Sequence, residues 1–537
     1  MTARDPIEAG LAAGWQAIDA SALTADRAFE ADVVIIGSGA GGGMSAEILA
    51  LAGLRVVLIE EGPLKSTRDF QMREADAYPA LYQESAARKT KDKSINILQG
   101  RCVGGSTTVN WTSSFRTPPP TLDFWRERFG LQDLTVRNLA PWFDMVERRL
   151  SIRTWTTRPN ENNDIMRRGG LKVGVAVGLI RRNVKGCWNL GYCGMGCPTN
   201  AKQSMLITTI PSALNRGAIL LSRLRAERLR IGGNRVAALE CRAMDPAGIH
   251  ASGVRVTVRG RHYVLAGGAI GSPALLLRSG APDPHGLLGK RTFLHPVVIA
   301  AAVMPQAVAG FSGAPQSLYS DHYMEENPID GPLGFKLEAP PLHPVLLSTT
   351  LHGFGETHAA LMRDFARIHA TLALIRDGFH PESRGGEVGL RGDGSPVLDY
   401  PLNDVFWEAA RRAFLAMAEI QFAAGARRVF VVHEQCQGYG SWEEAKEGIG
   451  RLEMKPFLTR VVSAHVMGGC AMAAAAERGV VRQDGRHHQL ENVSVFDGSV
   501  FPTSIGANPQ LSVYALAARN ASLLAAALTG RPAPAIA

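Results

Sequence analysis

The strongest pattern of apolar and polar positions lies over residues 32–62. A run of four apolar residues, 33–36, meets a turn rich in glycine, and a helix-compatible stretch leads to a second apolar run at 56–59. Short apolar runs bounded by glycine are typical of buried strands. The pattern therefore predicts a strand, a tight turn, a helix and a second strand, which is the order of a dinucleotide-binding unit.

Three glycines and one acid in this segment suit the binding of a dinucleotide. Gly37 permits the tight turn, Gly39 lets the backbone approach a pyrophosphate, and Gly42 lets the helix pack closely on the strand. Ala40, within the same turn, is also expected to contact the dinucleotide, and the N-terminus of the helix is expected to face the phosphates. Glu60, 18 residues after Gly42, stands where an acid would accept a hydrogen bond from a ribose hydroxyl. This segment alone leaves FAD and NAD as alternatives.

The later pattern indicates that the nucleotide-binding domain is interrupted. Residues 205–281 return to strands, a glycine turn and an apolar helix, whereas 290–460 contain extended runs and Pro-rich turns. One amphipathic helix is expected in the second region, with Asn403 or Asp404 at its start and Gly425 at its end. The apolar residues that recur at helical spacing are Phe406, Ala410, Ala413, Phe414, Met417 and Ile420.

The predicted fold is α/β with mixed α+β character. A Rossmann-like nucleotide-binding domain is interleaved with a second domain built on an antiparallel sheet with helices, and a terminal strand and helix return to the first domain. The predicted boundaries are 30–118, 205–290 and 461–530 for the first domain, and 119–204 and 291–460 for the second. A chain of 537 residues is too long for one ordinary core, which agrees with two domains.

Composition and charge argue against several classes of protein. The hydrophobic content of 46% and charged content of 20% are typical of a globular chain, and the net charge of +9 comes without a dense basic run, so no nucleic acid partner is expected. The first thirty residues carry acids throughout, so no secretory signal is expected. The apolar run from Phe293 is interrupted by His295 and Pro296 and is expected to be a buried strand. We expect a cytoplasmic location, or peripheral association with the inner face of the membrane.

A second small-residue turn lies within residues 98–118. Gly104, Gly105 and Ser106 form it, and Asn110 follows four residues after Ser106. A backbone with so few side chains would let a flat group approach closely, and the surrounding Ser and Thr residues offer many hydrogen bonds. The alternative is an ordinary turn.

Three cysteines lie close together in another glycine-rich loop. Cys187, Cys193 and Cys197 are spaced six and four residues apart, which allows an iron–sulfur cluster or another metal site. A fourth thiolate ligand is missing locally, so the favoured interpretation is a loop whose cysteines pack, and no metal ligand is assigned. Seven cysteines in total, an odd number, do not suggest a disulfide framework.

Four stretches along residues 32–521 resemble the glucose–methanol–choline (GMC) flavoprotein oxidoreductases. They are the opening glycine turn with Glu60, GRCVGGSTTVN at 100–110, GAIGSPALLLRSG at 268–280, and His465 with its Gly-Gly-Cys turn followed by DGSVFP and GANPQLS. The resemblance implies that the opening turn binds FAD and not NAD. It also places the turn at Gly104 on the flavin side. Because no histidine lies between Leu98 and Phe115, noncovalent FAD is expected.

The resemblance assigns further residues to the cofactor and to catalysis. Ala226 would bring a backbone to the adenine, and Asp497 and Gly498 would meet the ribityl–phosphate chain. Asn508 and Pro509, in the final loop, complete the expected cofactor set.

Oxidation of an alcohol by a flavin requires removal of the hydroxyl proton and transfer of a hydride to flavin N5. By resemblance His465 is the base, which suits the near-neutral pKa of histidine. Asn508, where the glucose-type members have a second histidine, would donate to the substrate oxygen. Glu338 is a possible third polar group in the substrate pocket. The favoured interpretation is instead that it is a surface or structural acid.

The cysteine loop before Lys202, with SAHVMG and SIGANP, is most similar to the long-chain (fatty) alcohol oxidases and dehydrogenases. The resemblance implies oxidation of long-chain primary alcohols to aldehydes in an apolar pocket of the second domain. The alternatives are a sterol oxidoreductase similar to cholesterol oxidase, a GMC dehydrogenase with an iron–sulfur cluster, a lyase that keeps FAD as structure, and an electron-transfer protein. The sequence leaves open whether oxygen, a quinone or a cytochrome accepts the electrons.

Overall fold

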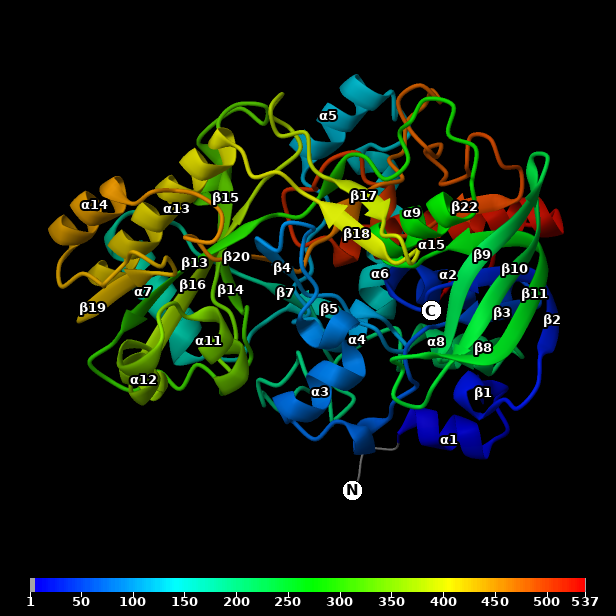
Figure 1. Ribbon diagram of the computed structural model, residues 1–537, viewed down its shortest axis with the longest axis horizontal. Helices are drawn as coiled ribbons and strands as arrows, with labels where there is room; N and C mark the ends of the chain where they lie inside the picture. The colour runs from blue at the N-terminus through cyan, green and yellow to red at the C-terminus, as the bar shows by residue number, and fades with distance from the viewer. Residues whose placement is uncertain (1–4, 537) are drawn as a thin grey trace.

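The computed structural model describes residues 5–536, which form two large sheets on either side of a central region of helices and loops (Figure 1). The first sheet has eight strands in the order β1-β8-β3-β2-β11-β10-β9, and β22 pairs with β11. Its strands are β1 (Ala17–Asp19), β8 (Ile219–Ser222), β3 (Val56–Ile59), β2 (Arg27–Ile36), β11 (Ala251–Leu265), β10 (Arg235–Met244), β9 (Leu224–Gly232) and β22 (Val493–Val495).

The opening unit has the predicted order. Strand β2 runs parallel to both of its neighbours, β3 and β11, and α2 (Ala40–Leu51) connects β2 to β3. Parallel neighbours need such a crossover, and strands covered on both faces are rich in Val and Ile, as residues 33–36 are. The strands β9, β10 and β11 form an antiparallel extension of the same sheet.

The last helix of the fold packs on the first domain, as predicted. Helix α15 (Gln510–Thr529) lies against α2 and α6 (Val136–Arg149). Within residues 5–536 it is the one helix whose length and composition would allow it to cross a membrane, but 72% of its most apolar window is buried inside the protein. Its apolar surface is therefore used as core.

The second sheet also has eight strands and is mostly antiparallel. Its order is β4-β20-β13-β16-β15-β14-β6, with β19 paired to β13. Its strands are β4 (Ile95–Ile97), β20 (Val461–Ser463), β13 (Val297–Val303), β16 (Ile368–Ile375), β15 (Phe335–Glu338), β14 (Leu318–Ser320), β6 (Gly178–Leu179) and β19 (Arg428–Val431). The apolar run after Phe293 is the buried central strand β13, as predicted.

The predicted amphipathic helix is α13 (Asp404–Ala423), which packs against this sheet and α7 (Glu161–Lys172). The side chain of Asn403 accepts a hydrogen bond from the backbone N–H of Phe406 and so caps the helix, and the six apolar residues predicted on one face are all buried. The prediction of its cap and its core face is therefore confirmed.

Several boundaries differ from the predictions. The short strands β4 and β20 pair with each other in the second sheet although both were assigned to the first domain, and β1 extends the first sheet before residue 30. These pairings join distant segments, which the pattern of a three-residue strand cannot specify. The rest of the domain division stays a prediction.

Two local patterns differ from the structure. The apolar run at 218–231 has the pattern of a single strand but forms two, β8 and β9, because Arg223 between them has a positive φ of 48°. Proline favours the first helical position, but helix α9 (Gly268–Arg278) begins five residues before Pro273.

The remaining elements cover these sheets or connect them. They are α1 (Pro6–Ala12), α3 (Glu74–Leu81), α4 (Ser106–Val109), α5 (Pro119–Phe129), α8 (Thr209–Leu214), α10 (His322–Glu325), α11 (Pro344–Thr350), α12 (Gly355–Arg363), α14 (Trp442–Arg451), and the strand pairs β5 (Ile152–Thr154) with β7 (Arg181–Asn183), β12 (Thr292–Phe293) with β21 (Met467–Gly468), and β17 (Glu387–Leu390) with β18 (Pro396–Asp399).

Candidate functional site

A cavity of about 710 Å³ lies where the first sheet, the turn after residue 98 and the C-terminal loop meet. Every residue predicted to bind the cofactor lines this cavity except Gly42 and Gly104, which lie directly behind the wall. The lining residues predicted from sequence are Gly37, Gly39, Ala40, Glu60, Gly105, Ser106, Asn110, Ala226, His465, Asp497, Gly498, Asn508 and Pro509. The structure therefore brings together side chains that are far apart in the sequence.

One wall of the cavity is the start of α2. A Cβ atom on Gly42 would lie 1.8 Å from the carbonyl oxygen of Gly37, so this glycine lets the helix sit directly on the turn. No side chain caps the helix start, and Gly39 faces Gly105 with only backbone between them. Free N–H groups at a helix N-terminus, in a cradle without side chains, are suited to the phosphates of a dinucleotide.

Glu60 joins the two glycine turns. Its Oε2 accepts hydrogen bonds from the N–H and Oγ of Ser38, at 3.1 and 2.6 Å, and its Oε1 accepts one from the N–H of Gly62 at 2.9 Å. Ser38 Oγ in turn accepts from the N–H of Gly104 at 2.9 Å. Burial raises the pKa of Glu60, against these hydrogen bonds. A carboxylate has about four acceptor positions, so one remains for the predicted ribose hydroxyl.

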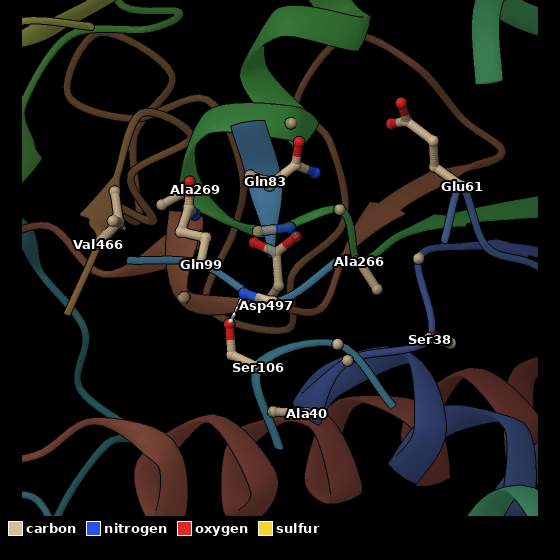
Figure 2. Close-up of a pocket in the computed structure, with 18 of the residues that line it drawn as sticks. Ser38, Ala40, Glu61, Gln83, Gln99, Ser106, Ala266, Ala269, Val466 and Asp497 are labelled. Carbon is tan, nitrogen blue, oxygen red and sulfur yellow. Dashed lines mark hydrogen bonds between the residues drawn. The ribbon is translucent and has the colours of Figure 1, made fainter. Parts of the chain in front are cut away.

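Sequence reasoning missed a second acid at this end of the cavity. Glu61 lies at the cavity wall, where it forms an ion pair with Arg101 at 3.4 Å, and in Figure 2 it is on the opposite side from Val466. Ala226 lies in the lining, and its carbonyl accepts a hydrogen bond from Arg278 at 3.2 Å. This is the end at which an adenosine would be held.

Asp497 reaches the cavity, but its carboxylate is used by the protein. Its Oδ2 accepts from the N–H of Gly268 and the Oγ of Ser272, and its Oδ1 accepts from the N–H and Oγ of Ser499. Figure 2 shows Asp497 in the middle of the cavity, between Ala266 and Ser106. The carboxylate therefore ties the C-terminal loop to α9, which leaves the backbone of this loop and Gly498 to face a ligand.

The predicted flavin-side turn is fixed by a residue that sequence reasoning did not single out. The side-chain amide of Asn110 donates to Oε1 of Gln510 at 2.7 Å, and Nε2 of Gln510 donates to the carbonyl of Ser113 at 2.8 Å. Gln510 follows Pro509 directly and lines the same cavity. The C-terminal loop and the Gly104 turn are thus held together across the site.

The cysteine loop is attached to this turn by a buried lysine. Nζ of Lys202 donates to the carbonyls of Thr108, Asn110 and Cys193, at 2.7, 2.8 and 2.7 Å. Burial lowers the pKa of Lys202 to about 8. Each cysteine of the loop, 187, 193 and 197, accepts a hydrogen bond from a nearby residue, and no group of three His, Cys, Asp or Glu side chains between residues 5 and 536 is arranged to hold a metal ion.

Replacing Lys202 by methionine is expected to lower the free energy of unfolding by about 2–4 kcal/mol, because three buried carbonyls lose a charged donor. The measurement is the urea unfolding curve of the purified protein. Lys185→Met is the matched control, because Lys185 lies in the same loop but is exposed. Equal curves for the two variants would show that the buried lysine does not anchor the loop.

His465 and Asn508 both line the cavity and are linked through His295, which contacts His465 and accepts a hydrogen bond from the N–H of Gly506, two residues before Asn508. His465 is half-buried, and Val466 beside it is at the far side from Glu61 in Figure 2. Burial lowers the pKa of His465 to about 4, with a smaller contribution from the charge of Lys336, so its imidazole is neutral at pH 7. The ring nitrogen Nδ1 of His465 lies 3.4 Å from Nδ1 of His295, a residue that sequence analysis noted only as an interruption of an apolar run.

Glu338 contacts Asn508 behind the cavity and is fully buried, so of the two favoured alternatives, a surface or a structural acid, the surface one is wrong. Its Oε2 accepts hydrogen bonds from Nε2 of Gln316 at 2.7 Å and from Nδ2 of Asn508 at 3.3 Å. Its Oε1 and the Oδ1 of Asn508 have no partner among the described atoms. Burial raises the pKa of Glu338 to about 7, against the lowering effect of Lys336. Glu338 and Asn508 are 170 residues apart in the sequence, so no local pattern indicates their contact.

The residues present fit FAD. The long cavity has a phosphate cradle at the start of α2, an acid for a ribose at one end, and at the other end a small-residue turn facing His465 and Asn508. The side chains at that end lie where the reactive ring of such a cofactor would be placed against a substrate.

Comparison with known proteins agrees with this fit. Models of the GMC oxidoreductase family match residues 78–297 and 381–517 of this chain. A GMC-type oxidoreductase of Mycobacterium tuberculosis (strain CDC 1551 / Oshkosh), described as uncharacterized, is 30% identical over 93% of this chain and 76% of its own length. A long-chain-alcohol oxidase of Arabidopsis thaliana is 27% identical over 92% of this chain and 67% of its own length.

The fold is also similar to a solved structure. The crystal structure of pyridoxine 4-oxidase from Mesorbium loti aligns with a TM-score of 0.66 over 91% of this chain and 98% of that chain, at 20% identity. At this identity the likeness concerns the fold, with its parallel-core sheet and its antiparallel-rich second sheet. The family models and the relatives together show that the chain belongs to the GMC oxidoreductase family and is an FAD-dependent oxidoreductase that acts on a CH–OH group.

Proposed function

We propose that this protein oxidises long-chain primary alcohols to aldehydes with noncovalently bound FAD. The observation that carries the proposal is the meeting of His465 and Asn508 at one end of a cavity whose other end is a dinucleotide cradle. Several relatives with 26–28% identity are long-chain-alcohol oxidases of Arabidopsis thaliana, which supports a long apolar alcohol over other substrates.

The protein's part in this reaction is to hold the hydroxyl group and to move its proton. FAD, when bound, supplies the hydride acceptor for the carbinol carbon. Asn508 lines the cavity and keeps one amide hydrogen for the substrate, because its other amide hydrogen is donated to Glu338. His465 contributes its ring to the same end of the cavity. These side chains orient the hydroxyl, and the apolar chain of the alcohol would extend away from them.

The dependence of kcat/KM on chain length tests the proposal. Each methylene group that becomes buried contributes about 0.8 kcal/mol, so kcat/KM should rise by up to about fourfold per methylene from butanol to dodecanol. The assay measures aldehyde formed with an artificial electron acceptor, and cholesterol is the comparison substrate. A flat dependence on chain length, or a higher kcat/KM for cholesterol, would contradict the assignment of long-chain primary alcohols.

A further inference from the structure

Gln316 lines the cavity from a strained position of the backbone. It lies two residues before the start of β14, is 6% exposed and has a positive φ of 46°, which is uncommon for residues other than glycine. Its own N–H donates to the carbonyl of Ala339 at 3.0 Å. The next two N–H groups along the chain donate to Oδ1 of Asn163, at 3.0 and 3.2 Å. Strain that the surroundings enforce in this way is a reason to look for a functional role.

The side chain of Gln316 is held beside Asn508 by one oxygen atom. Oε2 of Glu338 accepts a hydrogen bond from Nε2 of Gln316 at 2.7 Å and a second one from Nδ2 of Asn508 at 3.3 Å. Two nitrogens within hydrogen-bond distance of the same oxygen are neighbours, and both side chains line the cavity, whereas Glu338 is fully buried behind them. Glu338 therefore fixes two cavity amides without facing the cavity itself.

The carboxyl group also determines which way each amide is turned. Because Oε2 of Glu338 accepts both hydrogen bonds, the nitrogen of each amide points to it, and the oxygen points away. Burial raises the pKa of Glu338 to about 7, but a proton on its unpartnered Oε1 would leave Oε2 an acceptor. An amide nitrogen carries two hydrogens, and within residues 5–536 neither nitrogen has a second acceptor. Each side chain therefore keeps one N–H for a molecule in the cavity.

We propose that Gln316 is a further substrate-binding residue, whose free N–H and that of Asn508 form a pair of donors for the alcohol oxygen. The proposal rests on the oxidation of a CH–OH group and not on the chain length proposed above. As the hydroxyl proton is removed, negative charge develops on this oxygen, and two N–H groups fixed in advance stabilise it more than one. The predicted base, His465, keeps its role. Glu338 is a positioning residue in this arrangement, because it acts through the two amides.

Replacing Gln316 by leucine tests the pair of donors in the reaction. Leucine, like glutamine, is not branched at Cβ, so it meets the same strain at this φ and removes only the amide. The maximal rate of anaerobic flavin reduction by the alcohol should fall about 10- to 100-fold, while the alcohol concentration that gives half of this rate should change less than about threefold, because the lost N–H acts mainly on the developing charge. Gln437→Leu, at an exposed glutamine, is the control and should leave both unchanged.

Binding of unreactive amides separates contact with the ligand from a general loss of structure. The carbonyl of an aliphatic amide is a neutral acceptor that takes the place of the alcohol oxygen, and its binding to the oxidised holoenzyme is measured from the change in the flavin spectrum. For the tightest-binding member of a series from acetamide to decanamide, Kd should rise about 2- to 10-fold in Gln316→Leu, with FAD content unchanged. Gln316→Met, whose unbranched side chain is closer to glutamine in length, should behave in the same way, and Gln437→Leu should have the Kd of the unaltered protein.

The outcomes of the two experiments are distinguishable. An unchanged Kd in both variants of Gln316 would overturn the proposal, and so would the failure of every amide to bind the unaltered holoenzyme. An unchanged rate of flavin reduction in these variants would contradict a role of Gln316 in the reaction. If no primary alcohol reduces the flavin while amide binding still depends on Gln316, the proposed oxidation of long-chain alcohols fails and the pair of donors is supported.

Discussion

His465→Ala is expected to lower the rate of alcohol oxidation by about 10²- to 10⁴-fold while the protein keeps its FAD. His465 lines the cavity next to Val466, which Figure 2 shows on the opposite side from Glu61 and from the part that would bind the adenosine of the cofactor. Alanine removes the group that contacts the alcohol oxygen and leaves the cradle unchanged.

The measurement compares turnover and flavin content in the same preparation. The absorbance of bound flavin per protein should equal that of the unaltered enzyme, and turnover should fall. His285→Ala, at an exposed histidine, should leave both unchanged. A near-full rate in His465→Ala would remove this residue from the catalytic site, whereas loss of flavin would show that it holds the cofactor.

Gly42→Ala is expected to abolish the binding of FAD. The added Cβ would lie 1.8 Å from the carbonyl oxygen of Gly37 and 3.2 Å from the side chain of Ala266, so the helix start must move away from the turn. That movement would open the cradle whose N–H groups face the phosphates. Gly37 directly follows strand β2 and Ala266 directly follows strand β11, so neither can move without disturbing a buried strand.

The flavin absorbance of the purified variant measures this effect. Gly253→Ala is the matched control, because a Cβ on Gly253 would meet nothing within 4 Å. The control should purify as a yellow protein with full FAD content and the variant should be colourless. A yellow Gly42→Ala protein would mean that the helix can retreat without loss of the cradle.

The parts of the fold that were predicted correctly depend on local patterns. The strand, turn and helix around Gly37 and the amphipathic helix capped by Asn403 each follow from a few consecutive residues, because periodicity and capping act over one or two turns of chain. The short strands β4 and β20 lie in ranges that were assigned to the first domain, yet they pair in the second sheet across more than 360 residues of chain. A three-residue strand carries no information about such a partner.

The residues of the candidate site also differ in whether a local sequence motif reveals them. The residues of the cradle and the pair His465 and Asn508 stand in motifs, and the structure collects them around one cavity. Glu338, His295 and Lys202 do not stand in such motifs. Each contributes through one or more hydrogen bonds to a residue far away in sequence, and the positive φ of His295 becomes visible only in the folded backbone.

Anaerobic mixing of the FAD-loaded protein with dodecanol tests the proposed alcohol oxidation. We expect that the absorbance of oxidised flavin disappears and that one aldehyde forms for each FAD reduced, with the rate falling by about 10²-fold or more in His465→Ala. Unchanged flavin absorbance with dodecanol and with shorter and longer primary alcohols would contradict it.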